Sequence, residues 1–188
     1  MTFDDPVVDA LALQQPLPPI ESTNNVFHDL MSCLVEQQIH YRSTKRRFAR
    51  LLERAGLDDL TPATYPQFEQ EGLSSVKLSA QKVRAIAHTV DFFDAHTPDW
   101  AHLADDEVRA VLGEIPGIGP WTVDMILLYT LQRPDVFPAG DYHLKRIMTA
   151  RYKLTAPRLK AQMEAIAENW RPNRSLAVRL LLGAEKRS

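Results

Sequence analysis

Apolar residues recur at helical spacing along most of the chain. Val26, Leu30 and Leu34 are four positions apart, and similar spacing returns over 41–55 and 79–96. Such spacing places the apolar side chains on one face of a helix. We find no run that alternates apolar and polar residues as a half-buried strand would. The pattern therefore predicts an all-α protein of about nine helices.

The interruptions in this pattern set the expected helix boundaries. The first helix should span 24–39, with Thr23 or Asn24 as its cap, and the second should span 41–55 and end at Gly56. The remaining expected helices lie near 65–70, over 79–96 and 104–115, from Pro120 onwards, and over 142–153, 157–170 and 171–183.

The first 22 residues break the pattern. They end in LQQPLPPIES, whose prolines argue against a helix. We expect residues 1–22 to form an extended lead-in and residues 23–188 to carry the fold. A chain of 188 residues fits one domain, or two small lobes that share a cleft, and 45% hydrophobic residues suffice for a core.

Residues 112–125 predict a tight turn between two helices. Gly117 and Gly119 allow positive φ and close backbone approach, and Pro120 suits the first turn of a helix. Such a corner directs backbone N–H groups outward at a helix N-terminus, where a phosphate is favoured. The segment around Gly117, Ile118 and Gly119 is therefore a candidate grip on a nucleic-acid backbone.

Two runs carry a resemblance to a known family. LGEIPGIGPWTVDMI, followed by VFPAGDYHLKR, resembles the helix-hairpin-helix DNA glycosylase superfamily, and within it the compact members of the 3-methyladenine DNA glycosylase II (AlkA-like) branch. The hairpin alone also occurs in polymerases, ligases and nucleases. An aspartate 22 residues after the second hairpin glycine, here Asp141 after Gly119, is a more specific feature of the glycosylase superfamily than the hairpin alone. The resemblance spans most of 26–182 and implies two helical lobes within 23–188, flanking a cleft for DNA and the damaged base.

Asp141 is the candidate catalytic residue. It follows Gly140 and opens a helix, so it could be simply an N-cap worth about 1 kcal/mol. In the family it resembles, a carboxylate here would stabilise the positive charge that develops on the sugar as the base–sugar bond breaks. It could also orient or deprotonate the attacking water. The two roles are compatible.

The substrate follows from the chemistry of the leaving group. Methylation at purine N3 or N7 makes the base cationic, so it departs as a neutral species without a strong acid, and one carboxylate could suffice. We expect excision of alkylated purines, chiefly 3-methyladenine and also 7-methylguanine, from double-stranded DNA in base excision repair. The damaged nucleotide must be flipped out of the duplex. The alternatives are a glycosylase for ethenoadenine or deaminated bases, and a non-catalytic module that binds DNA damage.

Trp121 bears on the type of reaction. Superfamily members that also cut the strand carry a lysine two residues after the second hairpin glycine, where this chain has Trp121. The resemblance therefore implies a monofunctional hydrolase without lyase activity. Trp121 could stack on an alkylated base or belong to the core. Other candidates for the base pocket are Met125 and Leu182, where the family has aromatic walls, together with Tyr41 and His143.

The resemblance also implies contacts with the DNA around the lesion. A side chain that wedges into the stack is expected at Gln38, with Gln37 and Ile39 as alternatives. Thr122 and Lys145 are candidate phosphate contacts. A Na⁺ or K⁺ ion held by the carbonyls of Gly113, Ile115 and Ile118 could bridge the hairpin to a phosphate.

Charge is distributed unevenly along the chain. The formal net charge is −2, yet residues 145–188 contain eleven Lys or Arg and three acids. Residues 42–54 add six basic residues against Glu53. Such segregation could build a positive face for DNA phosphates, or it could reflect solvated helix faces without a partner.

Cysteine content and hydropathy limit the remaining possibilities. Cys33 is the one cysteine, which excludes a disulfide framework and a four-cysteine iron–sulfur cluster, and we expect it in the core. No Cys/His cluster indicates a catalytic metal, so we expect no cofactor beyond the hairpin cation. No apolar run of membrane-spanning length and no signal-peptide pattern occurs. We expect a cytoplasmic, nucleoid-associated monomer.

Overall fold

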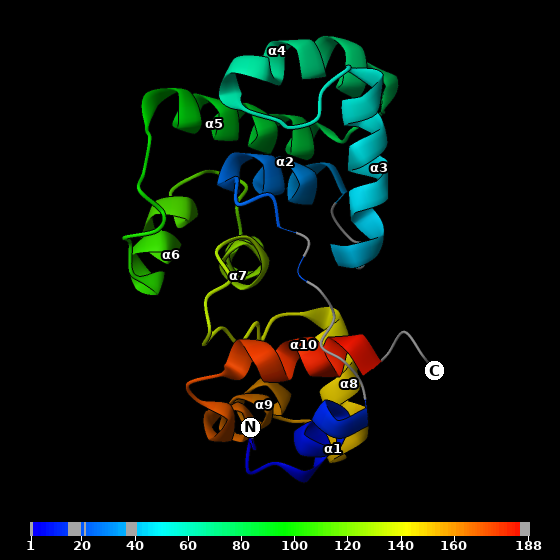
Figure 1. The fold of residues 1–188 in the computed structure, drawn as a ribbon, viewed down its shortest axis with the longest axis vertical. Coiled ribbons are helices and arrows are strands. Elements are labelled where there is room, and N and C mark those ends of the chain that lie inside the picture. The colour runs from blue at the N-terminus through cyan, green and yellow to red at the C-terminus, as the bar shows by residue number, and fades with distance from the viewer. Residues whose placement is uncertain (1, 15–19, 21, 37–40, 185–188) are drawn as a thin grey trace. The chain divides into compact units, whose positions relative to one another are not determined.

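The structure is a computed structural model that describes residues 2–14, 20, 22–36 and 41–184, with the backbone alone for 41–46. Within these residues every regular element is helical, and ten α-helices occur together with short 3-10 and π turns (Figure 1). The all-α prediction is confirmed. The count exceeds the expected nine because residues 6–14 are also helical.

The contacts of the chain divide it into two compact units. The central unit is Ser22–Ile126, and the terminal unit combines Met1–Glu21 with Leu127–Ser188. The terminal unit is therefore built from both ends of the chain, and the central unit is one continuous stretch.

The central unit is organised around α2 (Val26–Glu36), all of whose residues are buried. α3 (Tyr41–Arg54) and α5 (Ala80–Ala95) pack against it (Figure 1). Phe48 on α3 contacts His28 of α2 and Phe68 by ring edges, which closes the core on that side. The remaining elements are η1 (Pro62–Thr64), α4 (Tyr65–Gln67), η2 (Phe68–Gly72), η3 (Leu73–Ser75), α6 (Asp105–Gly113) and α7 (Pro120–Met125).

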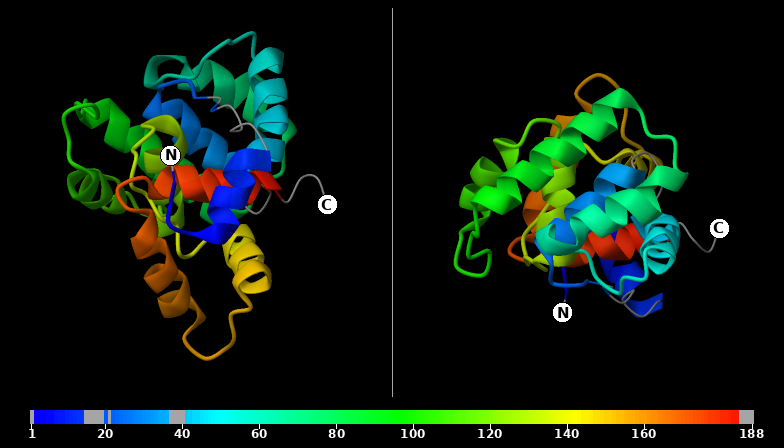
Figure 2. Two further views of the ribbon diagram at one scale, coloured as in Figure 1. Left: turned by 60° about the horizontal axis from the view of Figure 1, so that its bottom comes forward. Right: turned by 90° about the horizontal axis from the view of Figure 1, so that it is seen from above.

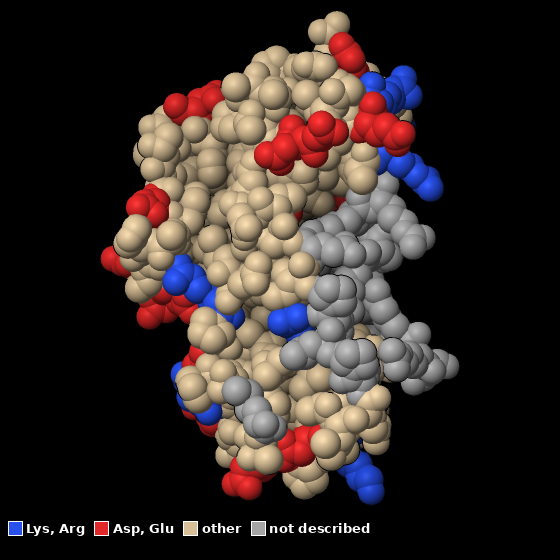
Figure 3. Space-filling view, in the orientation of Figure 1, with Lys and Arg blue, Asp and Glu red and all other residues tan. Residues whose placement is uncertain are grey.

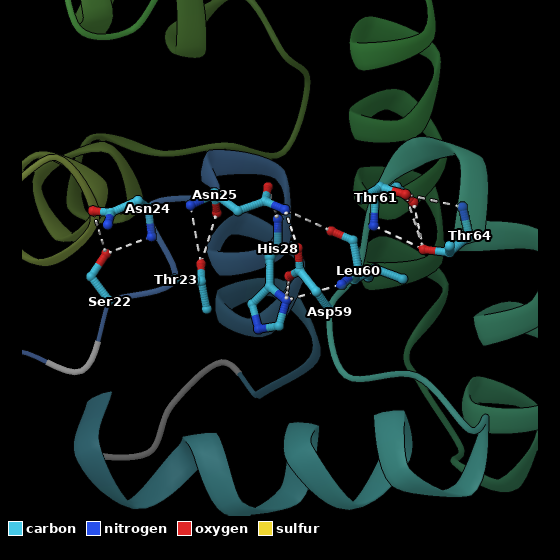
Figure 4. Close-up of polar contacts among 9 residues, drawn as sticks. All are labelled: Ser22, Thr23, Asn24, Asn25, His28, Asp59, Leu60, Thr61 and Thr64. Atoms are coloured by element: carbon cyan, nitrogen blue, oxygen red, sulfur yellow. Dashed lines mark hydrogen bonds and ion pairs between the residues drawn. The ribbon is translucent and has the colours of Figure 1, made fainter.

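A polar cluster fixes the start of α2 (Figure 4). Asn25, one residue beyond the expected cap, accepts the His28 N–H on Oδ1 at 3.1 Å. Its amide donates to Asp59 Oδ2 and to the Leu60 carbonyl, both at 3.0 Å. The His28 ring nitrogen Nδ1 lies 2.6 Å from Asp59 Oδ1. The cap therefore also ties α2 to the loop that follows α3.

The terminal unit contains α1 (Pro6–Gln14), α8 (Tyr142–Tyr152), α9 (Leu159–Ala167) and α10 (Arg174–Ala184). α10 packs against both α1 and α8, and α8 packs against α9 after the loop 153–158 (Figure 2). The π turn η4 (Ile126–Thr130) precedes α8, and the 3-10 turn η5 (Glu168–Trp170) follows α9. Trp170 is fully buried at the centre of this unit.

The expected extended lead-in over 1–22 is wrong for residues 6–14, which form α1. Pro6 opens this helix, where the missing N–H costs nothing. The buried Asp5 side chain accepts the N–H groups of Val7 and Val8, and it also accepts the indole N–H of Trp170 at 2.8 Å. The prolines of LQQPLPPIES come after residue 14, so they do not oppose the helix before them.

Two smaller expectations concern the core and membranes. Cys33 is buried in α2, as expected for a core residue. None of the helices in the described residues has the length and apolar character needed to cross a membrane.

Candidate functional site

The glycine hairpin lies between α6 and α7 of the central unit. Gly117 has φ +99°, and a Cβ there would lie 2.5 Å from the Ala85 Cβ on α5. Both the backbone conformation and the close approach therefore require glycine at this position. Gly119 is the N-cap of α7, and a Cβ there would meet no atom within 4 Å. The hairpin is thus tightly packed against α5 at Gly117 and has open space at Gly119.

A main-chain hydrogen bond and a contact from α5 hold this hairpin in place. The carbonyl of Ile115 accepts the Ile118 N–H at 3.0 Å, and both side chains are buried. His88 of α5 places Nδ1 3.2 Å from the Pro116 carbonyl. The hairpin is therefore fixed to the central unit before any ligand binds.

An ion pair joins the two hairpin helices. Arg109 of α6 donates to Asp124 of α7, with Nη1 2.5 Å from Oδ1. The Asp124 side chain thus bonds the facing helix. Asp124 is mostly buried and Arg109 is partly exposed, so the pair is shielded from solvent on one side.

The candidate site residues of α7 differ in their exposure. Trp121 is half-buried, whereas Thr122 and Met125 are buried. Thr122 is the third residue of the helix, so its main-chain N–H belongs to the first turn. A phosphate contact at Thr122 would thus use this N–H rather than the buried hydroxyl.

Asp141 lies at the N-terminus of α8 in the terminal unit. Its Oδ1 accepts the Leu144 N–H at 2.7 Å, its own N–H donates to the Pro138 carbonyl at 2.9 Å, and only 6% of the residue is exposed. The expected N-cap role is confirmed. These bonds leave the carboxylate little rotational freedom, as a preorganised electrostatic group requires.

The neighbours of Asp141 on α8 turn in different directions. Tyr142 is 70% exposed, and its ring contacts that of His143 edge-on, with the centroids 5.4 Å apart. His143 is half-buried and Lys145 is exposed. Leu182, on α10 of the same unit, is half-buried. The exposed ring of Tyr142 beside Asp141 was not singled out from the sequence.

The segment 131–140 that leads to Asp141 is anchored by α10. Arg174 Nε donates to Asp135 Oδ1 at 2.7 Å, and its Nη2 donates to Asp135 Oδ2 and to the Asp135 carbonyl at 3.0 and 2.9 Å. Ser175 Oγ accepts the Val136 N–H at 2.9 Å. Burial raises the pKa of Asp135, but the hydrogen bonds and charges of Arg174 and Arg171 outweigh it, and the net pKa lies below its ordinary value.

This anchor was missed from the sequence. From the sequence, the basic residues of 145–188, which include Arg174, were interpreted as a possible face for phosphates. Asp135 and Glu168 pair instead with Arg171 and Arg174. On the face drawn in Figure 3, the Lys and Arg side chains that the structure describes stand singly or in small groups.

The remaining sequence candidates are only partly visible. Gln37, Gln38 and Ile39 lie outside the described residues, so the wedge stays a prediction. Tyr41 begins α3, but its side chain is also outside the described part. Among the residues that the structure describes, no group of three or more His, Cys, Asp or Glu could hold a metal ion.

A glycine hairpin packed between two helices defines a helix-hairpin-helix protein, and its second helical unit carries an aspartate-capped helix. The chain belongs to the HhH-GPD superfamily of base excision DNA repair proteins, whose family model matches residues 31–172. That match contains the hairpin, Asp135 and Asp141.

Curated relatives are named as glycosylases for one alkylated base. YfjP of Bacillus subtilis, named provisionally as a DNA-3-methyladenine glycosylase, is 26% identical over 168 residues, which is 85% of this chain and 58% of that protein. DNA-3-methyladenine glycosylase 1 of Schizosaccharomyces pombe is 27% identical over 142 residues, which is 73% of this chain and 61% of that protein. The chain thus spans about three fifths of the length of these relatives.

Solved structures show the same fold. The 3-methyladenine DNA glycosylase Mag1 of Schizosaccharomyces pombe, in complex with abasic DNA, superposes with a TM-score of 0.77 at 23% identity, over 95% of this chain and 90% of that one. A DNA-3-methyladenine glycosidase of Bacillus halodurans gives a TM-score of 0.70 at 23% identity, over 98% and 91%. At this identity the likeness concerns the fold.

Proposed function

We propose that the protein is a DNA glycosylase that hydrolyses the N-glycosidic bond of alkylated purines, with 3-methyladenine as the chief substrate and 7-methylguanine as a second. The observation that carries the proposal is the carboxylate of Asp141, fixed by the Leu144 N–H at 2.7 Å in a chain of the HhH-GPD superfamily. Relatives named as DNA-3-methyladenine glycosylases support the choice of lesion.

The proposed reaction needs one carboxylate and one water molecule. As the base leaves with the electron pair of the glycosidic bond, its own positive charge is neutralised and the sugar becomes cationic. The Asp141 carboxylate stabilises that charge, as in glycoside hydrolysis. Water then adds to the anomeric carbon and gives up a proton to the Asp141 carboxylate. The products are the free base and an abasic site.

Release of free base from methylated DNA tests this proposal. Wild type should release 3-methyladenine above the spontaneous rate, and Asp141→Asn should be slower by about a hundredfold or more because the negative charge is lost. Asn is as good an N-cap as Asp, so the variant should stay folded and still bind abasic-site DNA. Binding without base release by wild type would instead support the damage-binding module.

A second candidate is a glycosylase for a different lesion. Met125 and Leu182, rather than aromatic residues, occupy the positions expected to wall the pocket, and Met125 is buried. A panel of duplexes carrying 3-methyladenine, 7-methylguanine, ethenoadenine and hypoxanthine distinguishes the two. The proposal fails if ethenoadenine or hypoxanthine is released faster than both methylated bases.

We further propose that the enzyme has no lyase activity, since Trp121 stands where a lysine nucleophile would be needed. Incubation with abasic-site DNA and borohydride should trap no covalent complex. A trapped complex, mapped to a lysine by peptide sequencing, would contradict this.

The hairpin is proposed as the grip on the DNA backbone, through the main-chain groups of Gly117, Ile118 and Gly119. A monovalent cation bound by the carbonyls of Gly113, Ile115 and Ile118 fits these residues, because a carbonyl that accepts one hydrogen bond keeps a second lone pair. Exchange of K⁺ for a larger organic cation at constant ionic strength should weaken DNA binding. We also propose a monomer acting on double-stranded DNA in the cytoplasm, at the nucleoid.

A further inference from the structure

The segment that carries Asp141 has no regular structure of its own. Residues 131–141 connect η4 to α8 without a helical turn, and a segment of this kind is ordinarily the more mobile part of a fold. Yet the electrostatic role proposed for Asp141 needs a carboxylate held in one place. The Leu144 N–H fixes the carboxylate itself, so the backbone that leads to Asp141 must be fixed by other contacts.

α10 supplies that restraint at the far end of the segment. Arg174 holds the Asp135 carboxylate with a two-pronged contact and also binds the Asp135 carbonyl. Ser175 accepts the Val136 N–H at 2.9 Å and donates to the Arg133 carbonyl at 2.6 Å. Main chain and side chain are thus both fixed over residues 133–136, and the Arg174 side chain is only 17% exposed.

A short series of contacts links this anchor to Asp141. Val136 and Pro138 are buried, so the chain between the two aspartates is pinned against the core. The Ala139 N–H donates to the Phe137 carbonyl at 2.9 Å, and the Asp141 N–H donates to Pro138 at 2.9 Å. These contacts leave few backbone torsions free between Asp135 and Asp141. A displacement of Asp135 would therefore also displace the N-cap of α8.

We propose that Asp135, Arg174 and Ser175 form a positioning cluster that sets the place of the Asp141 carboxylate for base release. The inference rests on the proposed glycosylase function. None of the three is a catalytic residue, because each acts through Asp141. In this role the mostly buried guanidinium of Arg174 acts on Asp135.

The test compares Asp135→Asn with wild type in three measurements. Single-turnover release of 3-methyladenine at saturating protein should fall about tenfold to a hundredfold, as misplacement by about 1 Å would cause. The dissociation constant for abasic-site DNA should stay within about twofold, because the hairpin is untouched. Amide exchange at Leu144, which reports the Asp141 cap directly, should become faster.

A matched control and a second variant of the cluster complete the test, at a temperature where all the proteins are folded. Glu164→Gln makes the same acid-to-amide change in an exposed ion pair with Lys160 on α9 of the same unit, and it should leave all three measurements unchanged. Arg174→Lys keeps the charge but loses the two-pronged contact, so its rate should lie between those of wild type and Asp135→Asn.

The outcomes separate the two claims. Wild-type base release with an Asp135→Asn rate within twofold overturns the positioning role and leaves the glycosylase function standing. A slower rate with unchanged exchange at Leu144, or with DNA binding weakened by the same factor, also overturns it. Absence of base release by wild type overturns the proposed function, and the positioning role falls with it.

Discussion

The Asp5 carboxylate lies 2.8 Å from the indole nitrogen of Trp170, a residue 165 positions further along the chain. The Tyr152 hydroxyl donates to the same oxygen, Oδ2, at 2.9 Å. Burial, and then the bond to Asp5, raise the pKa of Tyr152 well above its ordinary value, so the hydroxyl remains a donor. One buried carboxylate thus joins α1 to α8 and to η5.

Asp5→Asn should destabilise the protein by about 2 kcal/mol, because an amide nitrogen cannot accept the Trp170 N–H and leaves that donor unpaired. Urea denaturation followed by tryptophan fluorescence measures the loss. Asp4→Asn changes an exposed neighbour at φ +54°, where Asn is well tolerated, and should have no such effect. Equal stabilities of the two variants would contradict the role given to Asp5.

Gly117→Ala should cost at least about 2 kcal/mol, because φ +99° and the 2.5 Å approach to the Ala85 Cβ both oppose a side chain. Thermal unfolding checks this. Gly113→Ala, at the end of α6 and with open space around its Cβ, is the matched control and should be neutral or slightly stabilising. A Gly117→Ala protein that melts with wild type would show that the hairpin can relax away from α5.

Gly119→Ala should affect DNA binding more than folding. The position has space for a Cβ in the free protein, and loss of an N-cap glycine costs about 1 kcal/mol or less. If the open side of the corner receives a phosphate, the added methyl group would block it and weaken binding of abasic-site DNA about tenfold. Fluorescence anisotropy measures the affinity, and wild-type affinity in this variant would remove Gly119 from the proposed interface.

Asp141→Ala and Asp141→Asn should separate the two roles of this residue. Both should be inactive, since both lack the charge, but only alanine removes the acceptor for the Leu144 N–H. The alanine protein should therefore lose about 1 kcal/mol of stability while the asparagine protein stays near wild type. Parallel denaturation and base-release assays give both quantities. Equal stabilities would mean that the cap contributes nothing.

The Asp135 pair should make stability depend on pH in the acid range. Its folded-state pKa lies below the ordinary 3.8, so its contribution is present above that value and is lost as pH falls through the folded-state pKa. Asp135→Asn should be less stable than wild type by about 1 kcal/mol at pH 7. The difference should close below pH 3.8, as denaturation at a series of pH values would show. A gap that does not narrow as the pH falls below 3.8 would assign the loss to packing.

Local patterns predicted much of this molecule. The apolar spacing located α2, α5 and α6 to within three residues, because each has a buried face whose period can be read along the chain. Gly117 and Asp141 were recognised because their neighbours dictate the backbone there, and the structure confirms the hairpin and the cap.

Long-range pairing accounts for what was missed. The partners of Asp135 lie 36 and 39 positions away, and the distant partners of Asp5 lie 147 and 165 positions away, so no local period reveals them. The same pairing explains why a segment rich in arginine need not be a free basic face. The proline-rich stretch was assigned too broadly, because a proline limits the helix it would enter and not the one that ends before it.

Because both ends of the chain form the terminal unit, the order of synthesis determines when that unit can complete its core. At translation rates of about 5–20 residues per second, Trp170 leaves the ribosome on the order of ten seconds after Asp5. During that interval residues 22–126 can complete their own core, whereas Val8 and Leu11 of α1 have no partner to cover them. Within the terminal unit, α1 is thus the helix that waits longest for its packing partner α10.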